Sequence, residues 1–218
     1  MSIKDSFYIK QIDFKTAERV VERCHYAHRK ASCVYSFGLF NNENHRLVGV
    51  IIYGIPASDF VCKCICGESE KRNVYELTRL YVDDGLPKNC ESYLISNTIK
   101  LLDREIIISY SDTQYGHIGI VYQATNFIYT GLSLPHKDPV SNNRHNRHNK
   151  NRLSDGFVIR SPKHRYIYFN ANKRRKKELI KKLKLPILPY PKSNRNVPKT
   201  SFENISDMKG GYFNGSKV

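Results

Sequence analysis

Residues 75–131 alternate between short apolar segments and segments with apolar residues at helical spacing. The short segments predict strands at 76–82, 105–110 and from 128 onward, and the others predict helices at 91–102 and 116–127. This alternation restricts the chain to folds built on a sheet with parallel strands and covering helices. Polar residues gather where the strand 105–110 ends. Because ligands of open α/β sheets bind beyond the carboxyl ends of strands, we expect a functional site there.

The flanking segments extend the same pattern on both sides. A helix is expected to end near Cys24, and the apolar segments 34–40 and 47–54 predict an antiparallel hairpin around the turn 41–44. Further along the chain we expect strands at 157–160 and 164–169, followed by a basic helix at 173–185 that a proline-rich segment ends.

Composition indicates a single core domain with basic appendages. With 218 residues, 40% of them hydrophobic, the chain is long enough to bury a core. We expect a domain over 1–170 that includes a basic loop at about 134–156, then a basic helix and proline-rich segment over 171–192, then a disordered tail over 193–218. Neither a membrane-length apolar run nor a signal peptide is evident, so a cytoplasmic location is expected, with six cysteines as free thiols or metal ligands.

The charge of +16 is concentrated in one segment. Between residues 141 and 192 lie sixteen lysines and arginines but two acidic residues, so this segment carries +14. Such a concentration, interleaved with aromatic residues, indicates a polyanionic partner, and we expect double-stranded DNA. A solvated lysine-rich surface is the alternative. The candidate nucleic-acid-binding residues are Arg144, Arg147, Arg152, Lys173, Arg174, Arg175, Lys176 and Lys177.

The order of these elements resembles the Gcn5-related N-acetyltransferase (GNAT) fold. Residues 122–127 with Gly131 look like the fourth-helix signature of that superfamily. A closer resemblance, over about 25–131, is to the Mom DNA-modification proteins of bacteriophages, and it rests on four motifs in order: 76–82, 89–92, 109–113 and 116–127. The implied fold is α/β, a GNAT-like mixed central sheet flanked by helices, with a basic C-terminal extension.

The resemblance also implies an activity. Mom-like proteins convert adenine in DNA to N6-carbamoylmethyladenine, which protects phage DNA from restriction. The alternatives are an N-acyltransferase that acts on another amine, with coenzyme A or an aminoacyl-tRNA as its donor, and a non-catalytic DNA-binding protein of the same fold.

One departure concerns the donor. Acetyltransferases of this fold hold the coenzyme A pyrophosphate with a glycine-rich loop at a helix N-terminus. The corresponding loop 83–92 has one glycine and two aspartates. The donor is therefore left open between acetyl-CoA and an aminoacyl-tRNA, and tRNA would then be a second partner. Lys88, Asn89, Ser92 and Asn126 are the candidate cofactor-binding residues.

Two residues are the leading catalytic candidates. Asp112, at the end of a buried strand, is expected to orient or deprotonate the adenine amine, and a helix N-cap is the alternative. Tyr122, on the helix 116–127, is expected to protonate or stabilise the leaving group, as the resemblance implies. A core aromatic residue with a satisfied hydroxyl is the alternative for Tyr122.

Arg79 and Ser92 are candidates for holding the donor or its phosphate. In a regular strand Glu76 and Arg79 point to opposite faces, so we expect Arg79 to face another carboxylate or a phosphate. An ion pair with Asp112 is the structural alternative for Arg79. Ser92 also suits a plain helix start.

The pair His25 and Tyr26 is expected in the active site from the resemblance, and together with Asp112 it offers ligands for iron. His117 is a further candidate, with helix capping as its alternative. The thiols at 62, 64 and 66 would share one face of a strand, as zinc ligands or as small hydrophobic residues.

Overall fold

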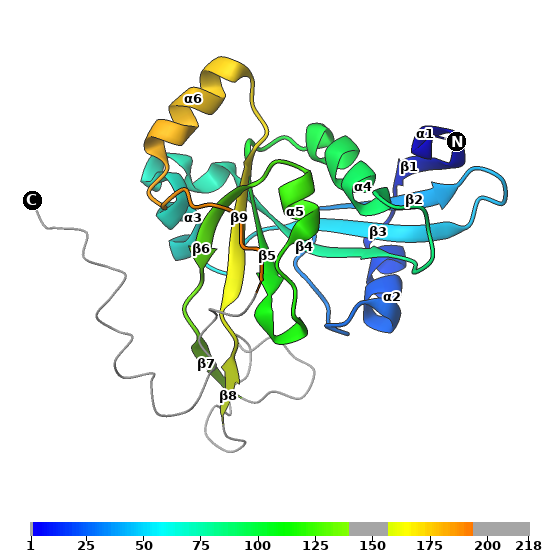
Figure 1. Cartoon of the computed structure of the whole chain (residues 1–218), viewed down its shortest axis with the longest axis horizontal. Helices are drawn as coiled ribbons and strands as arrows, with labels where there is room; N and C mark the ends of the chain where they lie inside the picture. The colour runs from blue at the N-terminus through cyan, green and yellow to red at the C-terminus, as the bar shows by residue number, and fades with distance from the viewer. Residues whose placement is uncertain (1, 140–156, 194–218) are drawn as a thin grey trace, which may run out of the picture. The chain divides into compact units, whose positions relative to one another are not determined.

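The computed structural model describes residues 2–139 and 157–193 and contains a seven-stranded mixed sheet (Figure 1). Its strand order is β1-β2-β3-β4-β5-β9-β6. The first four strands pair antiparallel, and β4 and β5 pair parallel. The bounds are β1 Phe7–Gln11, β2 Tyr35–Asn41, β3 Leu47–Gly54, β4 Val74–Val82, β5 Ile106–Asp112, β6 Ile128–Leu132 and β9 Lys163–Phe169.

Two short strands, β7 (His136–Pro139) and β8 (Phe157–Arg160), form a separate antiparallel pair. The α-helices are α1 Ile3–Ser6, α2 Phe14–Cys24, α3 Asp59–Cys66, α4 Cys90–Thr98, α5 Ile120–Ala124 and α6 Lys173–Lys182. The described ranges also contain three 3-10 helices: η1 Glu68–Asn73, η2 Ile99–Leu101 and η3 Thr113–Tyr115. Within the described ranges, none of the helices has both the length and the apolar character needed to cross a bilayer.

The chain forms two compact units. The first contains residues up to 110, then 119–131 and 165–190. The described part of the second contains 111–118, 132–139, 157–164 and 191–193.

In the first unit, alternation along β5 separates two cores. Ile107 packs in the core that α4 and α5 cover, whereas Ile106 and Ile108 pack in the core that α3 and α6 cover. Successive strand residues point to opposite faces, so these helices cover both faces of the sheet. A smaller apolar cluster joins α2 to β3 through Val21 and Ile52.

Three local expectations were wrong. Residues 62–66 belong to helix α3, which begins at the N-cap Ser58 and buries Cys62 and Cys66 one turn apart. The helix expected at 116–127 is shortened to α5, which begins after Gly119, because Gly116 and Gly119 adopt positive φ. Residues 136–139, expected in the basic loop, form β7, while 140–156 lie outside the described residues. Of the tail expected at 193–218, only Ser193 is described.

Gly119 gives a testable measure of packing at the start of α5. Its φ is +73°, and a Cβ there would lie 2.4 Å from Cε2 of Tyr166, a fully buried ring. Gly116 has nearly the same φ, +72°, but nothing lies within 4 Å of its Cβ position. We expect Gly119→Ala to lower the free energy of unfolding by roughly 3 kcal/mol, from backbone strain and overpacking together. Gly116→Ala should cost about 1 kcal/mol, from strain alone. Urea unfolding of both variants measures the difference, and equal losses would contradict the packing at Tyr166.

Candidate functional site

The candidate site begins where β4 and β5 stop pairing. Their parallel pairing runs from Val74 opposite Ile106 to Leu77 opposite Ser109, and β4 then continues to Val82. Figure 1 shows the two strands diverging beyond this point. Diverging parallel strands leave backbone and side-chain groups available to a ligand at the carboxyl end of the sheet.

An extra residue in β4 accompanies this divergence. Arg79 lies opposite Ile52 of β3 and Leu77 lies opposite Tyr53, so Thr78 has no partner of its own. This is a β-bulge. Because Glu76 lies opposite Gly54, the bulge places Glu76 and Arg79 on the same face of the strand. The expectation of opposite faces assumed a regular strand and was wrong.

Arg79 is held by backbone carbonyl groups. Its guanidinium donates to Thr78 O at 2.7 Å, to Arg29 O at 3.2 Å and to Lys30 O at 3.3 Å. Burial lowers the pKa of Arg79, and the nearby Tyr26 and Glu76 raise it in part. Arg79 therefore fixes the loop before β2 against the bulge, and its role toward a donor stays a prediction.

Tyr122 lies beside the last paired position of β5. Its side chain is buried on α5, and its ring packs against Phe127 and Tyr166 at centroid distances of 5.4 and 5.3 Å. Burial raises the pKa of Tyr122 to about 12, although a hydrogen bond with Ser109 lowers it in part. At neutral pH the phenol is therefore protonated and serves as a proton or hydrogen-bond donor.

Ser109 connects Tyr122 to the sheet. It is fully buried, and its hydroxyl donates to Leu77 O at 3.2 Å. Its hydrogen bond with Tyr122 ties the phenol to the sheet at this position. The sequence reasoning did not select Ser109, although a serine directly after three isoleucines in a buried strand was a usable signal.

His25 and Tyr26 lie in the first unit and stack, with ring centroids 4.2 Å apart. Electrostatic interaction with Tyr26 contributes to the raised pKa of Tyr122, so this pair belongs to the same neighbourhood. His25 Nδ1 accepts from the amide of Ala27 at 3.0 Å. This contact orients the imidazole ring at the C-cap of α2.

Across the described residues, no group of three or more His, Cys, Asp or Glu is arranged to hold a metal ion. The expected iron ligands include a tyrosine and come from both units, so iron binding by His25, Tyr26 and Asp112 stays a prediction. The thiols of α3 do not form a zinc site, since burial raises the pKa of Cys62, Cys64 and Cys66 and two of them face the core.

Asp112 belongs to the second unit, where its carboxylate has several partners. It accepts from the amide of Gln114 at 3.0 Å as the N-cap of η3 and from Ser161 Oγ at 2.6 Å, and it pairs with Lys163 Nζ at 3.1 Å. Burial raises its pKa, but these contacts outweigh burial and lower it. A lowered pKa does not favour a base. A role in orienting an amine stays a prediction, and the N-cap alternative is confirmed.

His117, also in the second unit, is exposed, and its amide donates to Asp112 O at 3.3 Å. This contact closes the turn after η3. The N-cap of α5 is Gly119, so His117 does not have the capping role that was its alternative. Its ring lies 6.1 Å from that of Tyr115.

The candidate cofactor-binding residues are placed at two helix ends. Lys88 and Asn89 are exposed just before α4, where Asn89 is the N-cap at φ +75°, and Ser92 is half-buried in the first turn. Asn126 is exposed at φ +59° directly after α5. In the loop between β4 and α4, Asp83 pairs with Arg46 at 2.9 Å. None of these contacts tests binding of a donor.

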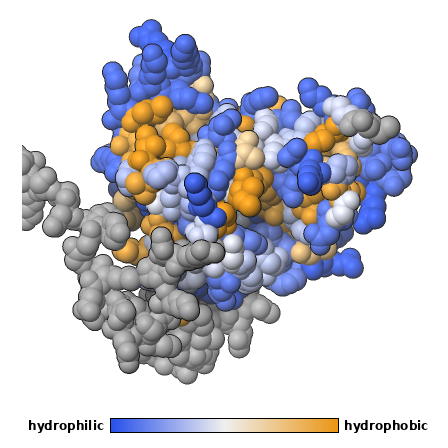
Figure 2. Space-filling model, in the orientation of Figure 1, coloured by the Kyte–Doolittle hydropathy of each residue, from blue (hydrophilic) through white to orange (hydrophobic). Residues whose placement is uncertain are grey.

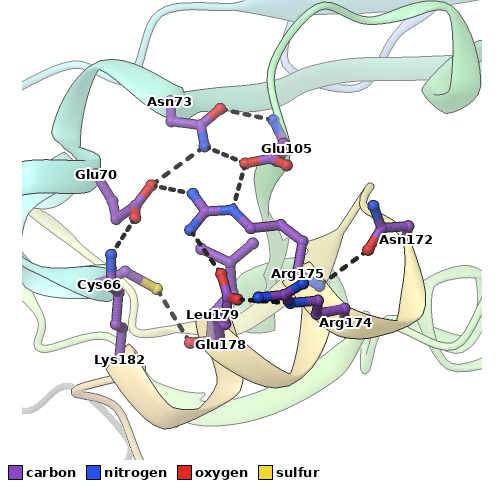
Figure 3. Close-up of polar contacts among 10 residues, drawn as sticks. All are labelled: Cys66, Glu70, Asn73, Glu105, Asn172, Arg174, Arg175, Glu178, Leu179 and Lys182. Carbon is purple, nitrogen blue, oxygen red and sulfur yellow. Dashed lines mark hydrogen bonds and ion pairs between the residues drawn. The ribbon is translucent and has the colours of Figure 1, made fainter.

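The basic residues of α6 fall into two sets. Arg175 and Lys182 both reach the buried carboxylate of Glu70 and form a clamp on it, at 2.7 and 2.6 Å (Figure 3). Arg175 also donates to Glu105 at 2.9 Å, and Asn73 bridges both acids. Arg175 was predicted to bind nucleic acid, but the structure assigns it to this clamp. Arg144, Arg147 and Arg152 lie outside the described residues.

The clamp was not foreseen from the sequence. Glu70 lies in a polar segment, and its partners are 105 and 112 residues away along the chain. Its carboxylate is 7% exposed, which is rare for an acid without paired cations.

A family model described as the Mom protein family matches residues 6–192. The chain belongs to the Mom protein family. A Mom relative, the methylcarbamoylase mom of Escherichia phage Mu, is 28% identical over 204 residues, which is 84% of this chain and 83% of the relative. The family predicted from the ordered motifs is confirmed.

The fold of this Mom protein resembles solved acetyltransferases. Arabidopsis thaliana NAA60, solved in complex with acetyl-CoA, superposes with a TM-score of 0.50 and 13% identity, over 75% of this chain and 98% of that one. The ribosomal-protein-S5-alanine acetyltransferase of Vibrio fischeri has a TM-score of 0.49 and 12% identity, over 77% of this chain and 94% of that one. The likeness to NAA60 concerns the fold alone, and the predicted GNAT-like mixed sheet is confirmed.

Glu70 supplies a pH-dependent test of the clamp. Burial raises its pKa, but hydrogen bonds from Lys182, Arg175 and Asn73 lower it to about 2 from an ordinary 4.5. Because the pKa is lower in the folded state, the stabilisation is complete above pH 4.5 and is lost as the pH falls toward 2. Glu70→Gln should lower the free energy of unfolding by roughly 3 kcal/mol at neutral pH, and by much less at about pH 3.

Urea unfolding at both pH values measures this change. Glu68→Gln is the matched control, because Glu68 lies on the same 3-10 helix with its side chain 65% exposed and should change stability little. A loss for Glu70→Gln that is independent of pH, or no larger than that of the control, would contradict the clamp.

Proposed function

We propose that this Mom protein transfers a carbamoylmethyl group to the N6 amino group of adenine in DNA and thereby protects the DNA from restriction. The observation that carries the proposal is the similarity to the phage Mu methylcarbamoylase, which extends over 84% of this chain and 83% of that enzyme. In the net change the N6–H bond is replaced by a bond from N6 to the methylene carbon of the carbamoylmethyl group, and the displaced proton departs with the donor's leaving group. Simple acyl transfer from a thioester or an ester would join N6 to a carbonyl carbon, so the proposed reaction requires attack at the methylene carbon or a rearrangement after transfer.

Tyr122 suits the role of acid in this transfer. Its phenol stays protonated at neutral pH, and Ser109 holds its hydroxyl at the point where β4 and β5 diverge. A positioned acid of this kind contributes typically about 10²- to 10⁴-fold to a rate. His25 and Tyr26, close to Tyr122, are proposed to line the same site.

The reaction also requires access to the base. The N6 amine of adenine is paired inside the duplex, so the target nucleotide must be flipped out of the stack. The half-exposed ring of Tyr26 offers a stacking face for such a base.

The donor is proposed to be an activated small group delivered by coenzyme A or by an aminoacyl-tRNA. The NAA60 structure holds acetyl-CoA, which favours the first. The loop after β4 favours the second, because Asp83 and Asp84 would face the pyrophosphate of coenzyme A in the place where acetyltransferases present glycines. Lys88, Asn89, Ser92 and Asn126 are proposed as the donor-binding residues.

Nucleoside mass spectrometry of DNA from cells that express the protein tests the proposal. Wild type should yield a deoxyadenosine derivative heavier by one carbamoylmethyl group in place of hydrogen. Tyr122→Phe, which removes the phenol and keeps the ring, should reduce this product by about 100-fold or more. Tyr8→Phe removes a hydroxyl on β1 that contacts His45, and should leave the yield unchanged.

Two results would contradict the proposal. Unmodified deoxyadenosine with wild-type protein present and folded would exclude the reaction. Full modification by Tyr122→Phe would exclude Tyr122 as its acid while leaving the reaction itself standing.

A further inference from the structure

The basic residues of α6 form two groups, one that contacts other parts of the protein and one that points outward from the helix. Arg175 and Lys182 are taken up by the clamp on Glu70, and Lys176 lies over the ring of Tyr168 at 4.9 Å. The remaining basic residues of the helix point outward and are exposed. They are Lys173, Arg174, Lys177 and Lys181, and they line a common shallow depression with Glu178.

The outward residues form one continuous face. Lys173, Lys177 and Lys181 follow each other at intervals of four residues, so they lie on one side of the helix over roughly 12 Å. Within the described ranges these three lysines form no ion pair, and Arg174 meets Glu178 at 3.7 Å. Figure 2 shows the corresponding end of the molecule as strongly hydrophilic.

The clamp makes this face a rigid one. Leu179 is fully buried in the core beneath α6, and Cys66 Sγ contacts its carbonyl at 3.7 Å. Four groups thus hold the inner side of the helix: the Leu179 side chain, its carbonyl, and the two clamped cations. A flexible lysine-rich segment needs no such anchoring, whereas a surface that positions a partner benefits from it.

We propose that the outward face of α6, formed by Lys173, Arg174, Lys177 and Lys181, docks the phosphate backbone of duplex DNA. Over about 12 Å of its axis a duplex presents roughly seven phosphate charges, which suits a ridge of four cations. Contacts of this kind fix the position of the protein on the duplex without reading its sequence. The inference rests on the proposed function, because DNA is the partner that this function requires.

Salt dependence of binding tests the surface. Fluorescence anisotropy of the full chain on a labelled DNA duplex gives the slope of log affinity against log salt. Each lost phosphate contact should change that slope by about 0.9. The double variant Lys177→Gln/Lys181→Gln should therefore have a slope smaller by about two, and should bind at least about tenfold more weakly near 0.1 M salt.

The matched control is Lys15→Gln/Arg19→Gln. These two residues are exposed on α2 with the same spacing, so the control removes equal charge from an equivalent helix position. It should retain the wild-type slope. The proposal would be overturned if the α6 double variant had the same salt slope as the control, whether that slope equals the wild-type value or is reduced in both.

An RNA hairpin is the second probe. If the α6 variant loses affinity for the hairpin and keeps its affinity for the duplex, the surface binds RNA and the proposal is overturned. Binding is measured without any donor, so the outcome is independent of the proposed chemistry. If the α6 double variant keeps the wild-type salt slope and still modifies DNA normally, the α6 surface is not the DNA-binding surface. The proposed function would then remain intact.

Discussion

The bulge at Thr78 is the constraint on which the candidate site depends. One extra residue in β4 brings Glu76 and Arg79 to the same face and lets Thr78 Oγ1 donate to Ser32 O and Ile52 O, each at 3.2 Å. The same residues connect β4 to the loop that follows α2, through the contacts of Arg79 with backbone carbonyls. Just before the bulge, β4 makes its last pair with β5, and the buried Tyr122–Ser109 pair lies at that position.

The clamp on Glu70 has a corresponding role beneath α6. A buried carboxylate is costly without partners, and here two cations and an amide compensate for its burial. This arrangement separates the basic residues of α6 that hold the helix in place from those that remain exposed on its outer side. Net charge alone could not make that distinction, because all of them contribute equally to it.

Much of the fold was predictable because periodicity reports which face of an element is buried. The strands at 76–82 and 105–110 and the hairpin at 34–54 follow from it, and several ordered motifs identified the family. The bulge was not predictable, since one extra residue in a strand leaves an apolar pattern that still reads as a strand. The spacing of the thiols at 62, 64 and 66 fits the two-residue period of a strand, and the spacing of 62 and 66 also fits one turn of a helix. In the structure Cys62 and Cys66 are buried on helix α3. Contacts such as Glu70 with Lys182 depend on the folded chain and leave no local signal.

The central claim is that Ser109 acts through Tyr122, so that the two form one catalytic unit at the divergence of β4 and β5. A double-mutant cycle tests it most directly, with the yield of modified deoxyadenosine measured for Ser109→Ala, Tyr122→Phe and the combined variant. We predict that the combined variant loses no more activity than Tyr122→Phe alone, because residues that act as a unit are not additive. Losses that multiply would contradict the account, since Ser109 and Tyr122 would then contribute independently.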